Sequence, residues 1–293
     1  MLAAFSWMDK RGLTLSYLHT SEARHGFYER LGYRLSSYFQ ARSLVEVGER
    51  WPGIEEPEIR RAAPEDAGVL NGLYESYYGK YSGAWSRSET FWVRRLQCKP
   101  KLWFTGEPEF WILEKEGPVA YLAAVPGAPA RIVELACPSN DVSAAKGLLD
   151  YVIQRLGVSE LEISLSERSS LWPVLNNYKV VDRTSAGNVF IRVQNSELFL
   201  GVARQLLSER AENSNLSFKI EVTDIGEVLA AECPGEKLTF SLPLQELGAA
   251  IYSGGRIQEL LDNGTLDLKE GKEEALMALF PENCASRCPM DGY

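Results

Sequence analysis

The sequence predicts a mixed fold, α/β combined with α+β, made of three consecutive segments. Stretches in which apolar and polar residues alternate, as in strands that bury one face, recur along the chain. Several are followed by stretches with apolar residues three and four positions apart, which is typical of helices that bury one stripe. With 293 residues, 45% of them apolar and 24% charged, the composition is that of a globular protein with room for at least two domains.

Two changes in composition indicate the segment boundaries. The stretch 51–57, Trp-Pro-Gly-Ile-Glu-Glu-Pro, has the composition of a linker and separates a first segment, 1–49, from a middle one, 58–195. Near Ser196 a strand-like stretch gives way to an amphipathic helix, which opens a third segment, 196–293.

The first segment predicts only a few elements. In order they are a helix over 2–10, a strand over 13–17, a short helix over 26–31 closed by Gly32, and an extended return over 33–47. So small a set cannot bury its own apolar side chains. We therefore expect five of them to pack on the other segments or on a second copy of the chain, which predicts a homo-oligomer. They are Leu13, Leu15, Tyr17, Phe27 and Leu31.

The middle segment predicts a strand meander, a helix and further strands. The strands are expected over 110–114, 119–125, 131–137, 160–165 and 189–193. The helix carries one apolar face made of Ala145, Leu148, Leu149, Val152 and Leu156. A complete domain of α/β character follows from this order.

The third segment predicts an antiparallel sheet closed by helices. Its strands are expected over 216–222, 228–230 and 238–242. A helix can begin at Pro243 and end at the glycine pair 254–255, and a second one begins at Ile257.

The stretch 27–33, Phe-Tyr-Glu-Arg-Leu-Gly-Tyr, puts a tyrosine in a short helix, followed by a glycine, an aromatic residue and a strand. This order resembles the end of a GNAT acyltransferase domain. With a middle segment of similar order and a third one that resembles a sterol carrier protein, the chain is similar over essentially its whole length to the enhanced-intracellular-survival (Eis) family of GNAT N-acetyltransferases. The resemblance implies the remnant of a first GNAT domain, a complete second one and a sterol-carrier-protein-like domain.

The cofactor half of the first domain has no counterpart in these residues. In the resembled family a glycine-rich loop ahead of a helix holds the pyrophosphate of acetyl-CoA on backbone N–H groups. A domain of that kind takes roughly 100 residues upstream of the tyrosine motif, whereas 26 residues precede Phe27 here. The resemblance therefore implies that this chain lacks most of its first GNAT domain and binds acetyl-CoA weakly or not at all.

The middle segment offers no replacement for that loop. The stretch 138–143, Pro-Ser-Asn-Asp-Val-Ser, contains no glycine. Ser139, Asn140 or Asp141 suits the N-cap of the helix that follows, and a carboxylate there repels a pyrophosphate. We therefore predict a degenerate, structural domain and assign no cofactor-binding residues.

The tyrosine motif of the middle segment is also altered. The stretch 172–178, Trp-Pro-Val-Leu-Asn-Asn-Tyr, occupies the place of the motif. Its Tyr178 matches Tyr33 of the first segment, so the tyrosine that would match Tyr28 is absent. This difference also predicts that the middle segment is not catalytic.

Acetyl transfer to an amine needs a base that deprotonates the amine and an acid that protonates the leaving thiolate. By the resemblance, the acid is Tyr28 and the base is the terminal carboxylate of Tyr293. Taken alone, a tyrosine in a short helix is as readily a packing residue, and a C-terminal aromatic residue as readily frays in solvent. Glu22 and His25, close to Tyr28 in sequence, suit exposed polar positions.

The leading hypothesis is an Eis-like N-acetyltransferase that transfers acetyl from acetyl-CoA to amines of a cationic small molecule or peptide, and that is inactive in the form of this chain. The alternative is a non-catalytic protein in which 196–293 holds a hydrophobic ligand or the segments serve assembly. Apolar alternation in that segment fits a filled core as well as a lipid site.

Charge and cysteine content exclude several other classes. The net charge of −9 disfavours a nucleic-acid surface and favours a cationic partner. No run of about 18 apolar residues predicts a membrane span, and charges at 9–11 interrupt any signal-peptide core, so we expect a cytoplasmic protein. Five scattered cysteines suit a reducing compartment, and the Cys284–Cys288 spacing is not that of a metal site.

Overall fold

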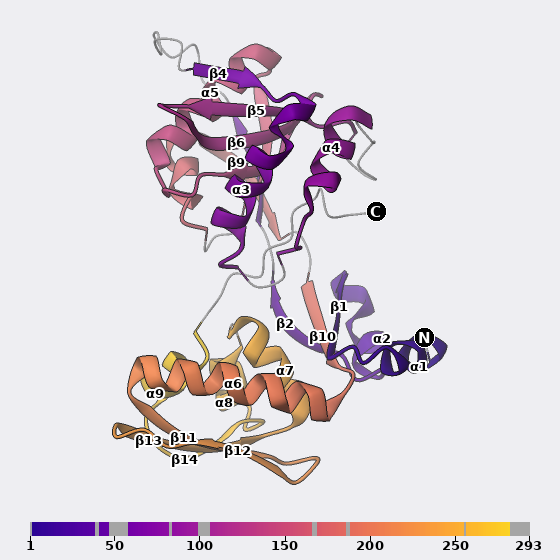
Figure 1. Cartoon of the computed structure of the whole chain (residues 1–293), viewed down its shortest axis with the longest axis vertical. Coiled ribbons are helices and arrows are strands. Elements are labelled where there is room, and N and C mark those ends of the chain that lie inside the picture. The colour runs from indigo at the N-terminus through magenta and orange to yellow at the C-terminus, as the bar shows by residue number, and fades with distance from the viewer. Residues whose placement is uncertain are drawn as a thin grey trace. The chain divides into compact units, whose positions relative to one another are not determined.

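The computed structural model describes residues 2–38, 41–46, 58–81, 84–98, 106–165, 169–185, 188–254 and 256–281. The chain divides into two compact units (Figure 1). Unit 1 contains Met1–Tyr38 and Gly187–Ala285, and unit 2 contains Phe39–Ala186 and Ser286–Tyr293. The mixed α/β and α+β fold class predicted from the sequence is confirmed.

The N-terminal elements of unit 1 form a three-stranded sheet with a strand from far along the chain. They are α1 (Leu2–Lys10), β1 (Leu15–Thr20), the 3-10 turn η1 (Glu22–Arg24), α2 (His25–Glu29) and β2 (Arg34–Tyr38). Strand β10 (Asn188–Val193) lies between β1 and β2 and is antiparallel to both. The predicted N-terminal helix, short helix and strands are thus confirmed, and their central partner comes from the end of the middle segment.

Both faces of β10 are buried, which explains its nearly continuous apolar run. Phe190 packs with Phe5 of α1, while Val193, on the opposite face, belongs to the core beneath helix α7 (Leu244–Ser253). Gly248 permits the close approach of α7, because a Cβ there would lie 2.7 Å from the Cγ2 of Val193. The N-terminal elements therefore pack on a strand and a helix from later parts of the same chain.

The five apolar residues expected to need partners divide into two groups. Leu15 packs against the core of the C-terminal elements, and Leu31 packs against Phe5, Tyr33 and Phe190. The other three are substantially exposed: Leu13 is 39%, Tyr17 37% and Phe27 48% exposed. Packing on the other segments is therefore observed for part of the set, and the homo-oligomer stays a prediction.

The C-terminal elements of unit 1 form a four-stranded sheet with helices. They are α6 (Ser196–Ser214), β11 (Leu216–Val222), β12 (Glu227–Ala231), β13 (Glu236–Leu242), α7, α8 (Ile257–Asp262), β14 (Asp267–Glu270) and α9 (Glu273–Leu279). The strand order is β12-β11-β13-β14. The inward-facing residues of β11 and β13 pack with α6, α7 and α9 in one apolar core.

The expectation of a purely antiparallel sheet is wrong at one pair, because β11 and β13 run parallel. After β12 the chain crosses the start of β11 and pairs on its other side. Gly235 makes the crossing possible, since a Cβ there would lie 1.5 Å from the carbonyl oxygen of Asn215. Ser217 anchors it: its hydroxyl donates to the Cys233 carbonyl at 2.6 Å and accepts from the Cys233 N–H at 2.8 Å.

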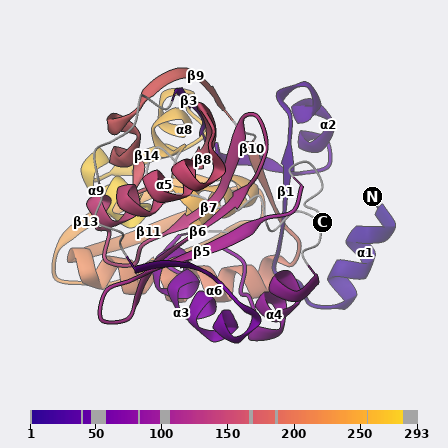
Figure 2. The ribbon, with the colours of Figure 1, turned by 90° about the horizontal axis from the view of Figure 1, so that it is seen from above.

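Unit 2 is built on a seven-stranded sheet in the order β4-β5-β6-β7-β8-β3-β9. Its strands are β3 (Ala41–Glu46), β4 (Glu58–Arg61), β5 (Glu109–Glu114), β6 (Pro118–Val125), β7 (Ala130–Ala136), β8 (Glu160–Leu165) and β9 (Lys179–Ser185). Its helical elements are η2 (Pro64–Asp66), α3 (Ala67–Tyr78), α4 (Glu89–Cys98), α5 (Val142–Leu156) and η3 (Trp172–Asn177). Figure 2 shows α5 on one side of β5 and β6, with α3 and α4 on the other.

Two strands cross the predicted segment boundaries. Strand β3, from the first segment, lies between β8 and β9 and is antiparallel to both, with Val45 fully buried in the core of unit 2. Strand β10, from the middle segment, lies in unit 1. Each unit therefore has a sheet completed by a strand from a neighbouring segment.

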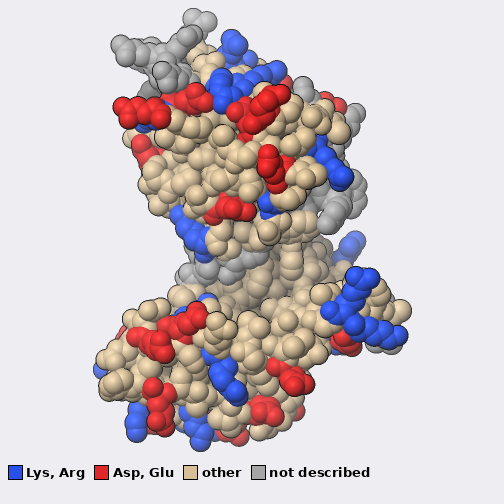
Figure 3. Space-filling view, viewed as in Figure 1, with Lys and Arg blue, Asp and Glu red and all other residues tan. Residues whose placement is uncertain are grey.

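No helix within the described ranges is both long and apolar enough to cross a membrane. On the face drawn in Figure 3, Lys and Arg side chains are interspersed with Asp and Glu side chains.

Candidate functional site

Tyr28 lies in α2 at the turn that leads into β2. Gly32 adopts a φ of +84°, which permits the chain to leave the helix. The Tyr28 carbonyl accepts the N–H groups of Leu31 at 2.9 Å and Tyr33 at 3.1 Å. The sequence Phe-Tyr-x-x-x-Gly-Tyr thus builds a tight helix end that holds the tyrosine backbone in place.

The Tyr28 side chain is half-buried and packs by its ring. The ring contacts that of Tyr33 edge-on at 5.9 Å and that of Phe27 at 5.1 Å between centroids. It lies against the cluster of Phe5, Tyr33 and Phe190. Among the described residues its hydroxyl has no hydrogen-bond partner, so the proton-bearing end of the side chain is available to a ligand.

Tyr33, by contrast, uses its hydroxyl within the fold. Ser16 donates to that hydroxyl at 3.0 Å, and Gln194 donates to Ser16 in turn. Tyr33 is 3% exposed. Of the two tyrosines in the motif, Tyr28 is therefore the one suited to proton transfer, and Tyr33 is a core residue.

His25 packs beside the same cluster, with its ring 4.7 Å from that of Phe190 and its Nε2 in contact with the side-chain amide of Asn188. Glu22 lies exposed in η1. The expectation of an exposed polar position holds for Glu22, whereas His25 is half-buried because β10 brings Asn188 and Phe190 against it.

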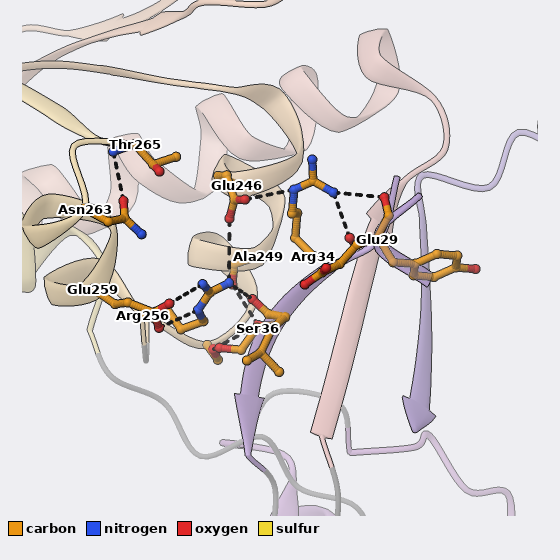
Figure 4. Close-up of polar contacts among 12 residues, drawn as sticks. Glu29, Arg34, Ser36, Glu246, Ala249, Arg256, Glu259, Asn263 and Thr265 are labelled. Carbon is orange, nitrogen blue, oxygen red and sulfur yellow. Dashed lines mark hydrogen bonds and ion pairs between the residues drawn. The ribbon is translucent and has the colours of Figure 1, made fainter. Parts of the chain in front are cut away.

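An ion-pair network joins the strand after Tyr28 to the C-terminal helices (Figure 4). The Nε of Arg34 lies 2.9 Å from Glu246 of α7, and Arg34 also donates to the Glu29 carbonyl at 3.3 Å. Arg256 donates to the Leu35 carbonyl at 2.8 Å. Burial raises the pKa of Glu246 above its ordinary value, with Arg256 and Arg34 acting in the opposite direction. The network positions α2 and β2, and nothing in the spacing of the sequence pointed to it.

The proposed base cannot be placed in this site. Tyr293 lies outside the described residues, as do Cys284 and Cys288. Among the residues that are described, no three His, Cys, Asp or Glu side chains gather as metal ligands would.

In unit 2 the N-terminus of helix α5 is capped by a side chain of the chain itself. Asp141 is the N-cap of α5 and accepts the N–H groups of Ser143 at 2.9 Å and Ala144 at 3.0 Å, as one of the predicted caps. The bond from Ala144 lowers the pKa of the Asp141 carboxyl, so the group is anionic at neutral pH. An incoming pyrophosphate would meet a charge of its own sign at this position.

Side chains of α3 also form hydrogen bonds near the point where strands β7 and β8 stop pairing. The two strands are parallel and pair only over Ala130–Ile132 and Leu161–Ile163. Beyond that point, Tyr78 donates its hydroxyl to the carbonyl of Leu135 at 3.0 Å. Tyr77 and Ser169 are joined by a 2.6 Å hydroxyl–hydroxyl bond. These polar groups of unit 2 are therefore satisfied within the fold.

Tyr178, the tyrosine of the altered motif, is tied down as well. Its hydroxyl donates to Asp150 of α5 at 2.5 Å, and burial raises the pKa of Tyr178. Unlike Tyr28, it is fastened to the neighbouring helix, which fits a structural role.

No protein-family model and no curated protein sequence matches the chain. Several solved structures do match the chain. A GCN5-related N-acetyltransferase from Kribbella flavida matches with a TM-score of 0.66 at 15% identity, covering 99% of this chain and 73% of that one. One from Anabaena variabilis matches with a TM-score of 0.64 at 14% identity, covering 98% and 74%. Eis1 from Mycobacterium abscessus matches with a TM-score of 0.58 at 16% identity, covering 98% and 75%.

These likenesses define the class of fold. The chain has the fold of GCN5-related N-acetyltransferases over nearly its whole length, in a form that spans about three quarters of each of these proteins.

Proposed function

We propose that this chain is part of an Eis-like N-acetyltransferase, an enzyme that transfers an acetyl group from acetyl-CoA to an amine of a cationic acceptor. The fold likeness over nearly the whole chain supports this kind of function. The observation that carries the assignment to a site is the Tyr28 side chain, which packs by its ring and leaves its hydroxyl without a partner among the described residues.

In the proposed reaction the amine nitrogen attacks the thioester carbonyl, so that an N–C bond forms and the C–S bond breaks. The proton lost by the amine goes to the terminal carboxylate of Tyr293, and the departing thiolate takes the proton of the Tyr28 hydroxyl. The acceptor is a cationic amine-bearing small molecule or peptide, a choice supported by the net charge of −9.

The test is acetyl transfer to a polyamine at millimolar acetyl-CoA, followed by mass spectrometry of the product. Such a concentration offsets weak coenzyme binding. At micromolar acetyl-CoA this chain is expected to be inactive, and the millimolar concentration should reveal only a slow residual rate. Tyr28→Phe should lower that rate about 100-fold or more, because general acid catalysis contributes 10²–10⁴-fold. Tyr17→Phe, an exposed tyrosine of the same unit, is the matched control and should leave the rate unchanged. Turnover that is absent, or equally fast in Tyr28→Phe, would contradict the proposal.

Acetyl-CoA binding by residues 1–293 is expected to be weak or undetectable. The helix end of unit 2 is capped by Asp141, and no glycine-rich loop stands ahead of α1 in these residues. Calorimetric titration should therefore give no dissociation constant in the micromolar range, and activity at micromolar acetyl-CoA should be absent. Micromolar binding would show that this chain holds a coenzyme cradle after all, without deciding the role of Tyr28.

A further inference from the structure

A groove in unit 2 lies at the edge of the large sheet. It has a volume of about 690 Å³, within the range of small-molecule sites. Its lining combines three arginines, one glutamate, two aromatic rings and aliphatic side chains from β4, β5 and α5, namely Ile59, Arg60, Arg61, Glu109, Trp111, Pro126, Tyr151, Arg155 and Leu156.

The strand pairing explains why these side chains meet. Arg61 of β4 is directly opposite Trp111 of β5, and its guanidinium lies 5.1 Å from the Trp111 ring. Helix α5 covers the same face and brings Tyr151 to 5.8 Å from Trp111. The guanidinium of Arg155, one helical turn beyond Tyr151, lies 6.0 Å from the centre of the Tyr151 ring. The floor of the groove is therefore an aromatic pair with a guanidinium at each end.

Two of the three arginines that line the groove form ion pairs with carboxylates. Arg60 is paired with Asp66 at 2.7 Å and with Glu114 at 2.8 Å, and Arg61 is paired with Glu109. Arg155 has no carboxylate partner among the described residues. One positive charge of this groove, on an exposed side chain, is thus left without a carboxylate partner among the described residues.

Trp111 supplies a second polar group without a partner. The residue is 5% exposed, and its indole N–H finds no hydrogen-bond acceptor in the described part of the chain. A buried donor left unsatisfied carries a desolvation cost that nothing offsets, so an acceptor brought by a ligand would be favoured here.

We propose that this groove binds a small carboxylate with an apolar body. The carboxylate accepts from the guanidinium of Arg155 and from the indole N–H of Trp111, and the apolar body lies on Ile59, Pro126 and Leu156. The site is separate from the proposed acetyl-transfer chemistry and does not depend on it.

The experiment titrates octanoate into the full ¹⁵N-labelled chain and follows the side-chain N–H signals of the tryptophans by NMR. Loss of one signal in Trp111→Phe, which keeps an aromatic ring and removes the N–H, assigns Trp111. We expect a saturable shift of that signal with octanoate and no comparable shift with octanol or octylamine, which match its length without its charge.

Arg155→Gln should weaken octanoate binding about tenfold or more, since it removes a charge-assisted contact. Arg183→Gln is the matched control, because Arg183 also lies over an aromatic ring of unit 2, that of Trp172, away from the groove. It should leave the dissociation constant unchanged within twofold. A shift that octanol reproduces, no shift at all, or affinity retained in Arg155→Gln would overturn the proposal. Arg155 also sits in the last turn of α5 and offsets the helix dipole, but a loss of that effect alone would alter stability and not octanoate affinity.

Discussion

Glu134→Gln is expected to lower the free energy of unfolding of unit 2 by about 3–5 kcal/mol. Glu134 of β7 and Arg87 form an ion pair at 2.8 Å with side chains that are 0% and 1% exposed. The variant keeps the shape of the side chain and leaves the guanidinium buried without its counter-charge. Removing one member of a buried pair costs more than the intact pair contributes, because the guanidinium loses its charge-assisted bonds to Glu134 while it stays out of water.

The surroundings of the pair explain why it can be buried at all. Arg87 donates to both Glu134 oxygens, and its guanidinium stacks 3.8 Å from the ring of Tyr74 and 4.9 Å from that of Trp92. Tyr121 donates its hydroxyl to Glu134, and burial raises the pKa of Tyr121. Each charged atom is therefore hydrogen-bonded or covered by an aromatic face.

Urea denaturation, with hydrogen exchange to locate the loss, measures the effect. Lys179→Gln is the control, since Lys179 forms an exposed pair with Glu46 and should change stability by less than about 1 kcal/mol. The double change Arg87→Met with Glu134→Leu should recover much of the stability, because it removes both charges together. A cost below about 1 kcal/mol for Glu134→Gln would mean that the pair is not buried as described.

Phe190→Ala is expected to destabilise unit 1 by about 3–5 kcal/mol, as is usual when a large buried ring is removed. Phe190 is 0% exposed and lies in β10, the central strand between β1 and β2. Its loss leaves a cavity among Phe5, Tyr33 and the ring of His25. The expected effect is large because α1 and α2 both pack on this one side chain, which comes from a strand far along the chain.

Hydrogen exchange provides the decisive readout. Protection should fall in Leu15–Thr20 and Arg34–Tyr38, the strands that β10 joins, and stay unchanged in β6 and β7 of unit 2. Phe27→Ala serves as the matched control, since Phe27 is 48% exposed and its removal should cost less than about 1 kcal/mol. Equal loss of protection in both units, or none in β1 and β2, would contradict the placement of β10.

Local features of the chain could be predicted because their causes are local. The apolar run in 110–114 and the alternation in 216–222 indicate strands, and β5 and β11 form there. Asp141 caps α5 because its carboxylate reaches N–H groups two and three residues ahead. Pro243 and Gly254 bound α7, as fixed φ and left-handed φ respectively predict.

The candidate site around Tyr28 and the buried ion pair depend on contacts between residues far apart in the sequence. The motif around Tyr28 was visible as sequence. Ser16 and Gln194 engage the hydroxyl of Tyr33, whereas that of Tyr28 has no partner among the described residues, and this difference could not be predicted. For the buried pair one signal existed, since Glu134 interrupts an apolar run in β7 and a buried carboxylate requires a partner. Arg87, 47 residues away, could not be identified as that partner from the pattern.

Several strands and helices, and some of their ends, could be predicted from local sequence, and the resemblance pointed to Tyr28 as the candidate acid. Which strands become neighbours depends on the tertiary fold: β3 enters the sheet of unit 2, β10 enters that of unit 1, and β13 runs parallel to β11. The reason is physical. Capping, turn chemistry and periodicity act within a few residues, whereas alternation states which face of a strand is buried and not which strand lies beside it. That choice depends on packing between distant segments.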